Sequence, residues 1–292
     1  MTHPLSASHY SDHASQAKVR IVENVPIAKQ TYRLRFDCQE IATRIVPGQF
    51  VMIRLADGDD PLLARPFALY DTVLGVSGKP VGLDIVYLVL GKMTTRLAGL
   101  LPGTELDVWG PLGNGFSSQE SGHLVMVAGG IGQTPFPALA QEAFGRRSYG
   151  DPPRSVAAVQ RVTLCYGARS SDYLADIDRF EHLGVDVRVS TDDGTAGHKG
   201  LVTDLVKDVL SEKKADEQIR IVCCGPEPMM ESVAAIAAQS DISCQVSLET
   251  PMACGIGICF SCVTRVRDAT GEWDYKRTCV DGPVFEASQI EW

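Results

Sequence analysis

The sequence predicts a multidomain β + α/β protein, with an antiparallel β-barrel, a parallel α/β domain and a small cysteine module in that order. Short runs rich in Val, Ile and aromatic residues fill residues 18–116 and are separated by Pro and Gly, which is typical of a barrel or sandwich. Strand-type and helix-type segments then alternate over residues 122–240, which indicates a parallel sheet with crossover helices. Residues 241–292 hold a cluster of four cysteines, Cys254, Cys259, Cys262 and Cys279.

The barrel domain, residues 18–118, is predicted from the strand-type segments VRIVENV, YRLRFDC, QFVMIRL, ALYDTV and GLDIVYLVL. Turn signals such as Pro47-Gly48 and Pro102-Gly103 separate these segments. The stretch GPLGNGF, residues 110–116, indicates the exit from this domain. Residues 1–17 are polar and rich in Ser and His, so we expect a disordered tail there.

The α/β domain, residues 119–240, is predicted to be Rossmann-like, with four strands that alternate with four helices. The strand-type segments are HLVMVA, RVTLCYGA, VDVRVSTDD and IRIVCCG. The helix-type segments are TPFPALAQEAFG, DYLADIDRFEHLG, LVTDLVKDVLSEKKA and EPMMESVAAIAAQS. The stretch GRRSYGDPPRSVAAVQ, residues 145–160, is expected to form a surface loop between two units. The cysteine module then occupies residues 241–292.

Composition limits the class of protein. The 292 residues carry a net charge of −9 and have a pI near 5.2, which argues against a nucleic-acid partner. No apolar run approaches the length of a membrane helix, and the N-terminus has no apolar signal region, so we expect no membrane and a cytoplasmic location. Nine cysteines without a signal peptide also suit a reducing compartment. Five of them are expected to be small buried hydrophobes: Cys38, Cys165, Cys223, Cys224 and Cys244.

The four clustered cysteines follow the pattern C-x4-C-x2-C-x16-C. Plant-type [2Fe–2S] loops use C-x4-C-x2-C with a remote fourth cysteine. Gly255 and Gly257 allow the tight turn that such a loop needs. Zinc is an alternative, although structural zinc sites usually show two C-x2-C pairs and only one is present here. Disulfides would need an oxidising compartment, and inert thiols are the plainest alternative.

Two glycine turns in the α/β domain are candidates for nucleotide binding. The first, in VAGGIGQTPFPAL, lies between a strand and a helix, where the backbone can approach a pyrophosphate and the helix N-terminus faces the anion. The second ends the last strand, and both should lie at one edge of a parallel sheet. A tight βα turn without a ligand is the alternative, since the spacing is not G-x-G-x-x-G. The candidate residues are Gly129, Gly130, Gly132, Thr134, Cys224, Gly225 and Pro226.

A third candidate site lies in the barrel. Arg65-Pro66-Phe67-Ala68 suits a flavin, because a guanidinium can meet phosphate and a ring can stack. Gly91 to Thr94 follow a strand and open a short helix, which resembles a phosphate-binding helix start. A core Phe beside a surface Arg, and a simple capping Thr, are the alternatives. The candidates beyond the first segment are Val86, Tyr87, Leu88, Gly91, Met93 and Thr94.

The order of these motifs resembles the ferredoxin–NADP reductase superfamily, in which the barrel holds FAD and the α/β domain holds the nicotinamide nucleotide. The segments MACGIGICFSC, TCVDGPVF and TDDGTAGHKGLVTD narrow the resemblance to the electron-transfer subunits of class 1B, NAD+-linked dihydroorotate dehydrogenases. The small subunit of NADH-dependent ferredoxin–NADP oxidoreductase has a similar ending but typically carries Asp at the position of Cys254.

This resemblance implies an oxidoreductase subunit of pyrimidine biosynthesis that contains FAD and a [2Fe–2S] cluster and uses NAD as substrate. Dihydroorotate is expected to be oxidised at FMN in a separate catalytic subunit, in a heterotetramer of two copies of each chain. Electrons would pass through the cluster and FAD to NAD+, so we expect no catalytic general base in this chain. Alternatives are a diaphorase-type NAD(P)H reductase subunit of a ferredoxin, hydrogenase or sulfite reductase complex, and a metal-stabilised binding module without enzyme activity.

Two residues depart from the pattern of the resembling family. Ala68 stands where the flavin motif usually ends in Ser or Thr, so a backbone N–H must replace the hydroxyl. Leu88 occupies a position where relatives commonly carry a basic residue, and Lys92 is a candidate for the missing charge. NADH over NADPH is implied by the resemblance; Asp172 is a candidate to repel a 2′-phosphate, with a helix cap as its alternative. Arg169 is either a cation for the nucleotide or part of a surface ion pair.

Overall fold

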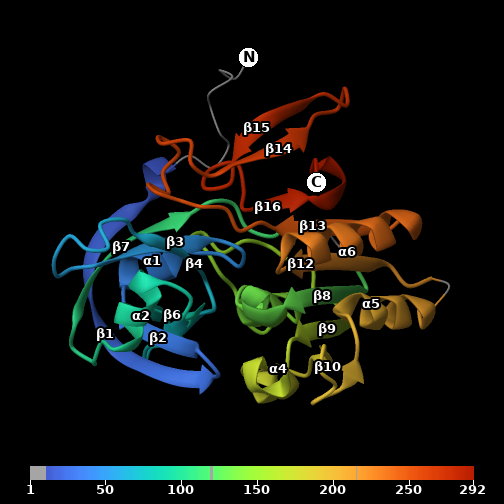
Figure 1. Cartoon of the computed structure of the whole chain (residues 1–292), viewed down its shortest axis with the longest axis horizontal. Coiled ribbons are helices and arrows are strands. Elements are labelled where there is room, and N and C mark those ends of the chain that lie inside the picture. Colours follow the sequence, from blue (N-terminus) through green and yellow to red (C-terminus); the bar gives the residue numbers. More distant parts are fainter. Residues whose placement is uncertain (1–10, 119–120, 215) are drawn as a thin grey trace.

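The computed structural model describes residues 11–118, 121–214 and 216–292. A β-barrel and an α/β domain stand side by side, and a C-terminal hairpin lies over both (Figure 1). The predicted combination of a barrel, a parallel α/β domain and a third module is confirmed.

The barrel is one seven-stranded antiparallel sheet in the order β4-β3-β7-β1-β2-β6-β5. Alternating apolar side chains from its strands fill the interior, as period-2 patterning predicts. Its strands are β1 (Ser15–Ala28), β2 (Thr31–Asp37), β3 (Phe50–Leu55), β4 (Arg65–Ala68), β5 (Asp71–Leu74), β6 (Pro80–Leu88) and β7 (Glu105–Leu112), and its helices are α1 (Gln39–Arg44) and α2 (Lys92–Ala98).

Order begins earlier in the chain than the sequence indicated. Ser11–His13 form a 3-10 helix, and β1 already pairs with β7 at Ser15, opposite Gly110. The polar composition of this segment gives no strand pattern. A strand at the barrel surface can form nevertheless, because its backbone hydrogen bonds to the neighbouring strand do not depend on its side chains. The expectation of a disordered tail is therefore corrected for residues 11–17, and its remainder, residues 1–10, lies outside the described residues.

The α/β domain is built on a sheet in the order β11-β10-β9-β8-β12-β13-β16. All neighbouring pairs are parallel except β13 with β16. The strands are β8 (His123–Gly129), β9 (Arg161–Ala168), β10 (Asp186–Thr191), β11 (His198–Lys199), β12 (Ile219–Cys224), β13 (Ser243–Ser247) and β16 (Val284–Glu286). The helices are α3 (Phe136–Ala143), α4 (Ile177–His182), α5 (Val202–Ser211) and α6 (Glu227–Gln239), and short 3-10 turns lie at Gly130–Gln133, Ser171–Tyr173 and Ala287–Gln289.

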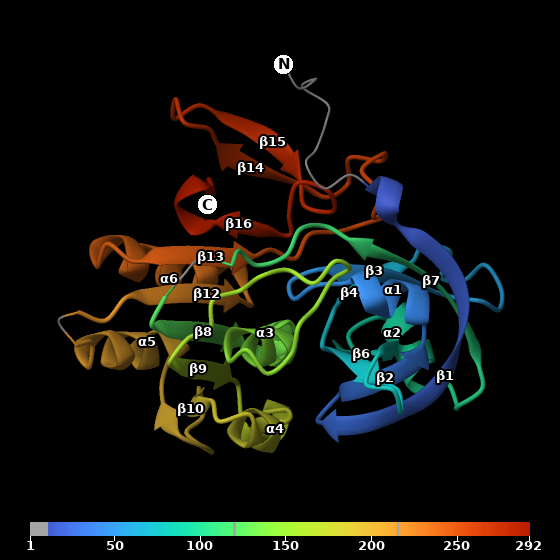
Figure 2. The ribbon, with the colours of Figure 1, turned by 180° about the vertical axis from the view of Figure 1, so that it is seen from behind.

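The helices cover both faces of this sheet. Apolar residues of α5 and α6 pack with one face, and those of α3 and α4 pack with the other. Figure 2 shows α3 on the side of the sheet that faces the barrel. The five cysteines outside the cluster are buried, as predicted.

The cysteine module shares strands with the α/β sheet. β13 pairs with β12 and β16 pairs with β13, although both lie within the predicted module of residues 241–292. Only the β14 (Val263–Arg267) and β15 (Trp273–Arg277) hairpin forms a sheet of its own. The predicted boundary at residue 240 therefore falls inside the larger sheet, because a sixth parallel strand, β13, follows α6.

The stretch of residues 145–160 differs from the predicted surface loop. Tyr149 is 3% exposed and belongs to the core cluster of the barrel. Arg154 forms an ion pair with the buried Glu142 of α3 and donates to the carbonyl oxygen of Phe116. Polar composition suggested exposure here, but these polar groups meet partners at the junction of the domains. None of the described helices combines the length and apolar character needed to cross a bilayer.

Candidate functional site

The two glycine turns meet at the carboxyl edge of the sheet, as predicted. β8 and β12 are parallel neighbours, with Ala128 opposite Cys224, so both strands end side by side. A Cβ on Gly132 would lie 2.1 Å from the carbonyl oxygen of Cys224, and a Cβ on Gly225 would lie 2.9 Å from Gly129 N. The turns touch through their backbones, which leaves only glycine at these positions. Such a bare backbone edge fits a pyrophosphate-type ligand.

A pocket of about 550 Å³ opens beside these turns. Gly129 and Gly225 line it together with Glu249, which follows β13, and with Arg265 and Tyr275 from the hairpin. Desolvation raises the pKa of Glu249. Burial raises the pKa of the Cys224 thiol, and the nearby Glu249 charge raises it further. The Cys224 thiol is therefore neutral at physiological pH, and its residue is buried.

Arg169 and Asp172 lie at the end of β9 and differ in their partners. Arg169 is exposed and makes no ion pair with any residue in the described ranges. Asp172 forms an ion pair with Lys29 Nζ at 3.3 Å, and its carbonyl oxygen accepts the backbone N–H of Lys29 at 2.8 Å. Asp172 thus joins the α/β domain to the barrel, so it is a poor candidate to repel a 2′-phosphate.

The barrel segment Arg65–Ala68 forms β4 at one end of the barrel sheet. Arg65 is exposed, and its Nη1 donates to the carbonyl oxygens of Leu63 at 3.1 Å and Ala64 at 2.9 Å. Phe67 instead packs into the barrel core, edge-on to Tyr87 with ring centroids 5.9 Å apart. The alternative of a core Phe beside a surface Arg therefore describes these two side chains. A cofactor here would meet the guanidinium and the backbone.

The remaining barrel candidates also divide into residues of the core and residues that a cofactor could reach. Tyr87 and Met93 are core residues, Val86 is also buried, and Leu88 is half-buried. Thr94 caps α2, since its Oγ1 accepts the backbone N–H of Gly91 at 3.1 Å. The ammonium of Lys92 meets the carboxylate of Asp60 and is thereby engaged. The exposed Gly91 and half-buried Thr94 remain the accessible part of this helix start.

The four clustered cysteines come together as two pairs. Cys262 and Cys279 are buried, with their Sγ atoms 3.2 Å apart. Cys254 lies close enough to Cys259 to help lower the pKa of the Cys259 thiol, and Cys259 is exposed. Within the described part of the chain, no three side chains of ligand type meet at one point. Each iron of a [2Fe–2S] cluster bound by four thiolates takes two of them, so two pairs fit such a cluster.

Two of the four cysteines, Cys259 and Cys262, have lowered pKa values. The Ser261 hydroxyl, 3.2 Å from Cys259 Sγ, lowers the pKa of Cys259 to about 6. The Cys279 thiol lowers the pKa of Cys262 to about 6, and the same contact raises the pKa of Cys279. Metal ligation requires deprotonated thiols, so the lowered pKa values of Cys259 and Cys262 suit a ligand role for these two residues.

The cysteine loop packs directly on the barrel. Gly255 has φ +72°, and a Cβ there would lie 2.5 Å from Met52 Cγ on β3. The indole N–H of Trp109 on β7 donates to the carbonyl oxygen of Cys254 at 3.1 Å. Ala64 belongs to the apolar cluster that contains Cys262 and Cys279, and it directly precedes β4. The cysteine loop and the candidate flavin segment are therefore neighbours.

Sequence reasoning missed several residues at this site. Trp109 supports the cysteine loop, and Glu249 and Trp292 line the pocket. Asp71 of β5 accepts hydrogen bonds from several side chains of the α/β domain. No local pattern marks any of them, because each acts through a partner far away in the sequence.

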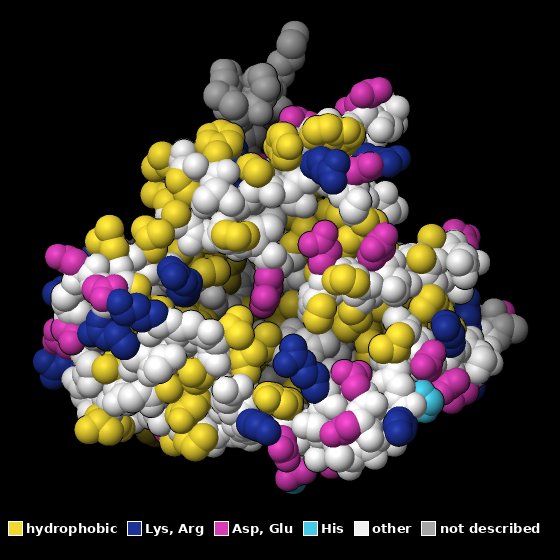
Figure 3. Space-filling view, in the orientation of Figure 1, with side chains coloured by type: hydrophobic (Ala, Val, Ile, Leu, Met, Phe, Trp, Pro, Cys, Tyr) yellow, Lys and Arg dark blue, Asp and Glu magenta, His cyan; other side chains and the backbone are white. Residues whose placement is uncertain are grey.

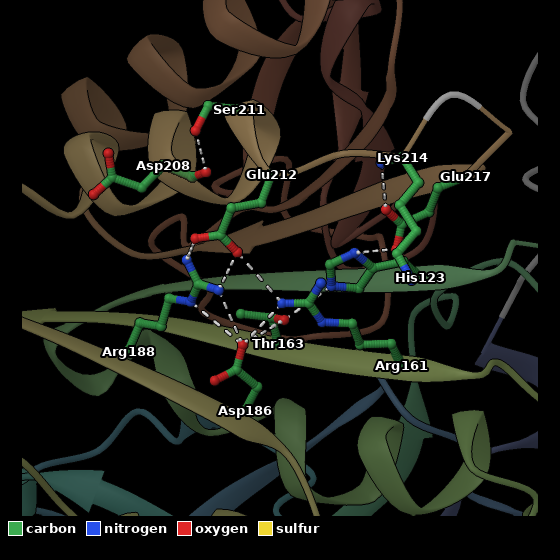
Figure 4. A network of polar contacts seen from close by, with 10 residues as sticks. All are labelled: His123, Arg161, Thr163, Asp186, Arg188, Asp208, Ser211, Glu212, Lys214 and Glu217. Carbon is green, nitrogen blue, oxygen red and sulfur yellow. Dashed lines mark hydrogen bonds and ion pairs between the residues drawn. The ribbon is translucent and has the colours of Figure 1, made fainter.

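A second polar network lies at the opposite, amino-terminal edge of the sheet (Figure 4). His123 of β8 is 1% exposed, with Nε2 2.9 Å from Thr163 Oγ1 and Nδ1 3.2 Å from Glu217 Oε1. Arg188 bridges Asp186 and Glu212 beside it. These groups stabilise the start of the sheet, away from the ligand edge.

Three family matches cover most of the chain. Residues 18–116 match the oxidoreductase FAD-binding domain, and residues 126–235 match the oxidoreductase NAD-binding domain. Residues 249–291 match the iron–sulfur cluster binding domain of dihydroorotate dehydrogenase B. The chain therefore carries FAD-binding, NAD-binding and iron–sulfur cluster binding domains.

Similar proteins agree with these matches. The electron transfer subunit of dihydroorotate dehydrogenase B (NAD(+)) from Desulforamulus reducens is 35% identical, over 91% of this chain and 94% of that relative. The subunit of the same name from Caldanaerobacter subterraneus is 33% identical, over 94% and 97%. Among solved structures, an NADH-dependent reduced ferredoxin–NADP oxidoreductase has a TM-score of 0.76 at 31% identity, over 94% of this chain and 90% of the other. A cytochrome P450 reductase from Amycolatopsis shares the fold, with a TM-score of 0.61 at 22% identity, over 77% and 66%.

Proposed function

Because the chain belongs to the family of electron transfer subunits of NAD(+)-dependent dihydroorotate dehydrogenase B, we propose that it collects electrons from an FMN-containing catalytic subunit and delivers them to NAD+. Two copies of each chain form the working complex. None of the described cysteines forms a disulfide, which suits the reducing cytoplasm, where we place the complex.

One observation carries this proposal: the cysteine loop packs on the barrel beside the candidate flavin segment. Met52 and Leu112 of the barrel share an apolar cluster with Cys262 and Cys279, and Ala64 of that cluster adjoins Arg65. When bound, the cluster exchanges single electrons, and FAD exchanges single electrons or a hydride. A loop held against the barrel keeps the two sites at a fixed separation.

The chain's own residues hold and separate the bound groups. We assign the cluster to Cys254, Cys259, Cys262 and Cys279. Arg65 and the backbone from Pro66 to Ala68 would hold FAD, together with the backbone of Val86 to Leu88 and the helix start around Gly91, Met93 and Thr94. The backbone of Gly129, Gly130 and Gly132, with Thr134 and Cys224 to Pro226, would hold NAD. We assign no general base to this chain, since the cofactors supply the chemistry.

The partner is proposed to dock on the exposed end of the cysteine loop. Ile258 and Phe260 are 68% and 57% exposed and flank the exposed Cys259. Figure 3 shows hydrophobic side chains gathered over the module that contains this loop. Exposed apolar groups beside a redox site suit a protein contact that excludes water. The substitution Phe260→Asp, which places a charge in this patch, should weaken assembly with the partner. Leu101→Asp, in an exposed turn at the far end of β7, should not weaken it.

The test is reconstitution with the neighbouring subunit. The chain is co-expressed with an FMN-containing dihydroorotate dehydrogenase subunit, and NADH formation from dihydroorotate is followed by absorbance. We expect turnover with the native chain and none with Cys259→Ser, which still contains the barrel and α/β domains. A stable complex with iron, sulfide and FAD but without dihydroorotate-dependent NADH formation would refute the proposal.

The second candidate is a diaphorase-type subunit that serves another electron carrier. It is favoured by the likeness to the NADH-dependent ferredoxin–NADP oxidoreductase structure. The thiol of Cys254 weighs against it, because that family typically carries Asp at this position. Ferredoxin reduction by NADH, measured with the same preparation, distinguishes the two.

A further inference from the structure

A single buried carboxylate joins the barrel to the α/β domain. Asp71, the first residue of β5, is 4% exposed. Its Oδ1 accepts hydrogen bonds from Arg147 Nη1 at 2.9 Å and from the Tyr149 hydroxyl at 2.9 Å. Its Oδ2 accepts hydrogen bonds from Gln141 Nε2 at 2.7 Å and from Arg179 Nη2. Two guanidinium groups therefore face one carboxylate at the domain interface.

The residues on either side of Asp71 add further contacts. The Tyr70 hydroxyl donates to Asp176 Oδ2 at 2.6 Å, and the Tyr70 carbonyl oxygen accepts the backbone N–H of Ala138 at 3.2 Å. Arg147 Nη2 donates to the carbonyl oxygen of Thr72 at 2.6 Å. The contacts of this short segment thus reach α3, the loop that follows it and the start of α4. A rotation of either domain would break several of them together.

Charge balance gives this contact a preferred geometry. The side chains of Arg147 and Arg179 are 14% and 28% exposed, so water screens them poorly. A buried ion pair adds little stability by itself, but separation of its partners leaves uncompensated charge. The arrangement around Asp71 therefore opposes tilting of the domains more than it stabilises the fold.

The position of Asp71 connects the two candidate binding segments. Asp71 lies three residues after β4, which ends at Ala68. Gln141 belongs to α3, which begins two residues after Thr134 of the first glycine turn. The cysteine loop reaches the barrel elsewhere, at Met52 and Leu112 on β3 and β7. Asp71 therefore links the candidate FAD and NAD segments without involving the cluster.

We propose that Asp71 is a positioning residue that holds the nucleotide-binding turns in the orientation that hydride exchange with the flavin requires. The inference rests on the proposed function only in that FAD and NAD occupy the segments assigned above. Hydride-type transfer needs reacting atoms about 3–3.5 Å apart, and a displacement of about 1 Å can cost about 100-fold in rate. Loosening of this contact should thus slow the nicotinamide step selectively.

The experiment compares two matched variants of the holoprotein. Asp71→Asn keeps the shape of the side chain but removes the charge between Arg147 and Arg179. Asp107→Asn is the control, because Asp107 is a 5% exposed carboxylate whose partner, Arg54, also belongs to the barrel. Stopped-flow absorbance follows flavin reduction by NADH, and hydrogen–deuterium exchange follows the amides around residues 70–72 and 141–149.

We expect Asp71→Asn to slow flavin reduction by about 10- to 100-fold and to raise amide exchange at both segments, with iron and FAD content unchanged. Asp107→Asn should change the rate less than about twofold. Should Asp71→Asn fail to fold, Tyr149→Phe, which removes one neutral donor to the same carboxylate, should show the same selective slowing on a smaller scale.

The inference is overturned if amide exchange rises in Asp71→Asn while the rate with NADH stays within about twofold of the native rate. It is also overturned if Asp107→Asn slows the reaction equally. The assay needs only NADH and this chain, so failure of dihydroorotate-dependent turnover would refute the proposed function and leave this result unaffected.

Discussion

The carbonyl oxygen of Cys224 lies 2.1 Å from the position that a Cβ on Gly132 would occupy. The two turns at the ligand edge are therefore packed backbone against backbone, and this contact sets the shape of the nucleotide site.

Gly132→Ala should separate the two turns. The added methyl group meets main-chain atoms that cannot rotate away, so we expect the free energy of unfolding to fall by about 1–3 kcal/mol. Urea denaturation followed by circular dichroism measures the loss, and the affinity for NADH should fall with it. Gly130→Asn is the control for the unfolding measurement alone, because Gly130 has φ +55°, which Asn tolerates, and nothing lies within 4 Å of its added Cβ. Equal loss in both variants would show that the contact with Cys224 is unimportant.

Trp109→Phe should loosen the cysteine loop without removing a ligand. The change deletes the N–H that donates to the carbonyl oxygen of Cys254, which costs about 0.5–1.5 kcal/mol in local stability. We expect iron to be lost several times faster to a chelator, measured as iron per chain over time. Trp273→Phe on the exposed face of β15 should lose iron at the native rate. An unchanged rate in Trp109→Phe would mean that the loop is held by its apolar contacts alone.

Several parts of the molecule could be predicted because they depend on local spacing. The cysteine pattern and the strands of the barrel follow from residue types at short intervals, and the meeting of the two glycine turns follows from the shared carboxyl edge of parallel strands. The direction of a side chain could not be predicted so well. The sequence places Phe67 and Tyr87 in the candidate flavin segments but does not show that their side chains pack in the barrel core, because strand periodicity leaves open which face is inside.

The domain interface could not be predicted from local sequence at all. The donors to Asp71 lie 70 to 108 positions further along the chain. No sequence pattern relates the acid in the apolar strand to the two arginines, one of which lies in a loop and the other in a short helix. Only the folded arrangement of β5, α3 and α4 shows that the three charges belong together.

Gln133→Met should stabilise the protein. Gln133 is fully buried, and neither its Nε2 nor its Oε1 has a hydrogen-bond partner among the described residues. An unpaired buried amide costs about 1–3 kcal/mol, and Met has a similar shape without polar atoms at its end, so we expect a gain of about 1–2 kcal/mol. Thermal unfolding of the FAD-loaded protein measures it.

The control for this substitution is Gln49→Met. Gln49 Nε2 donates to the carbonyl oxygen of Gly113 at 2.7 Å, and its Oε1 accepts the backbone N–H of Val46 at 3.0 Å. Removal of a fully bonded amide should destabilise the protein by about 1 kcal/mol or more. Loss of stability in both variants would mean that the amide of Gln133 has a partner in the loaded protein.

His123 should make the protein less stable in mild acid. Burial, followed by the charge of Arg161, lowers the pKa of His123 below its usual 6.5, against the opposing pull of Glu217. Below pH 6.5 the unfolded chain takes up a proton that the folded chain does not. The unfolded state therefore binds more protons, and the free energy of unfolding decreases as the pH decreases. The contribution is fully present above pH 6.5 and is lost as the pH falls toward and through the pKa of His123 in the folded protein.

His123→Gln cannot titrate, so its unfolding temperature should decline less between pH 7 and pH 5 than that of the native protein. His182→Gln, at an exposed position on α4, should follow the native curve, and a native-like decline in His123→Gln would assign the acid sensitivity to other groups.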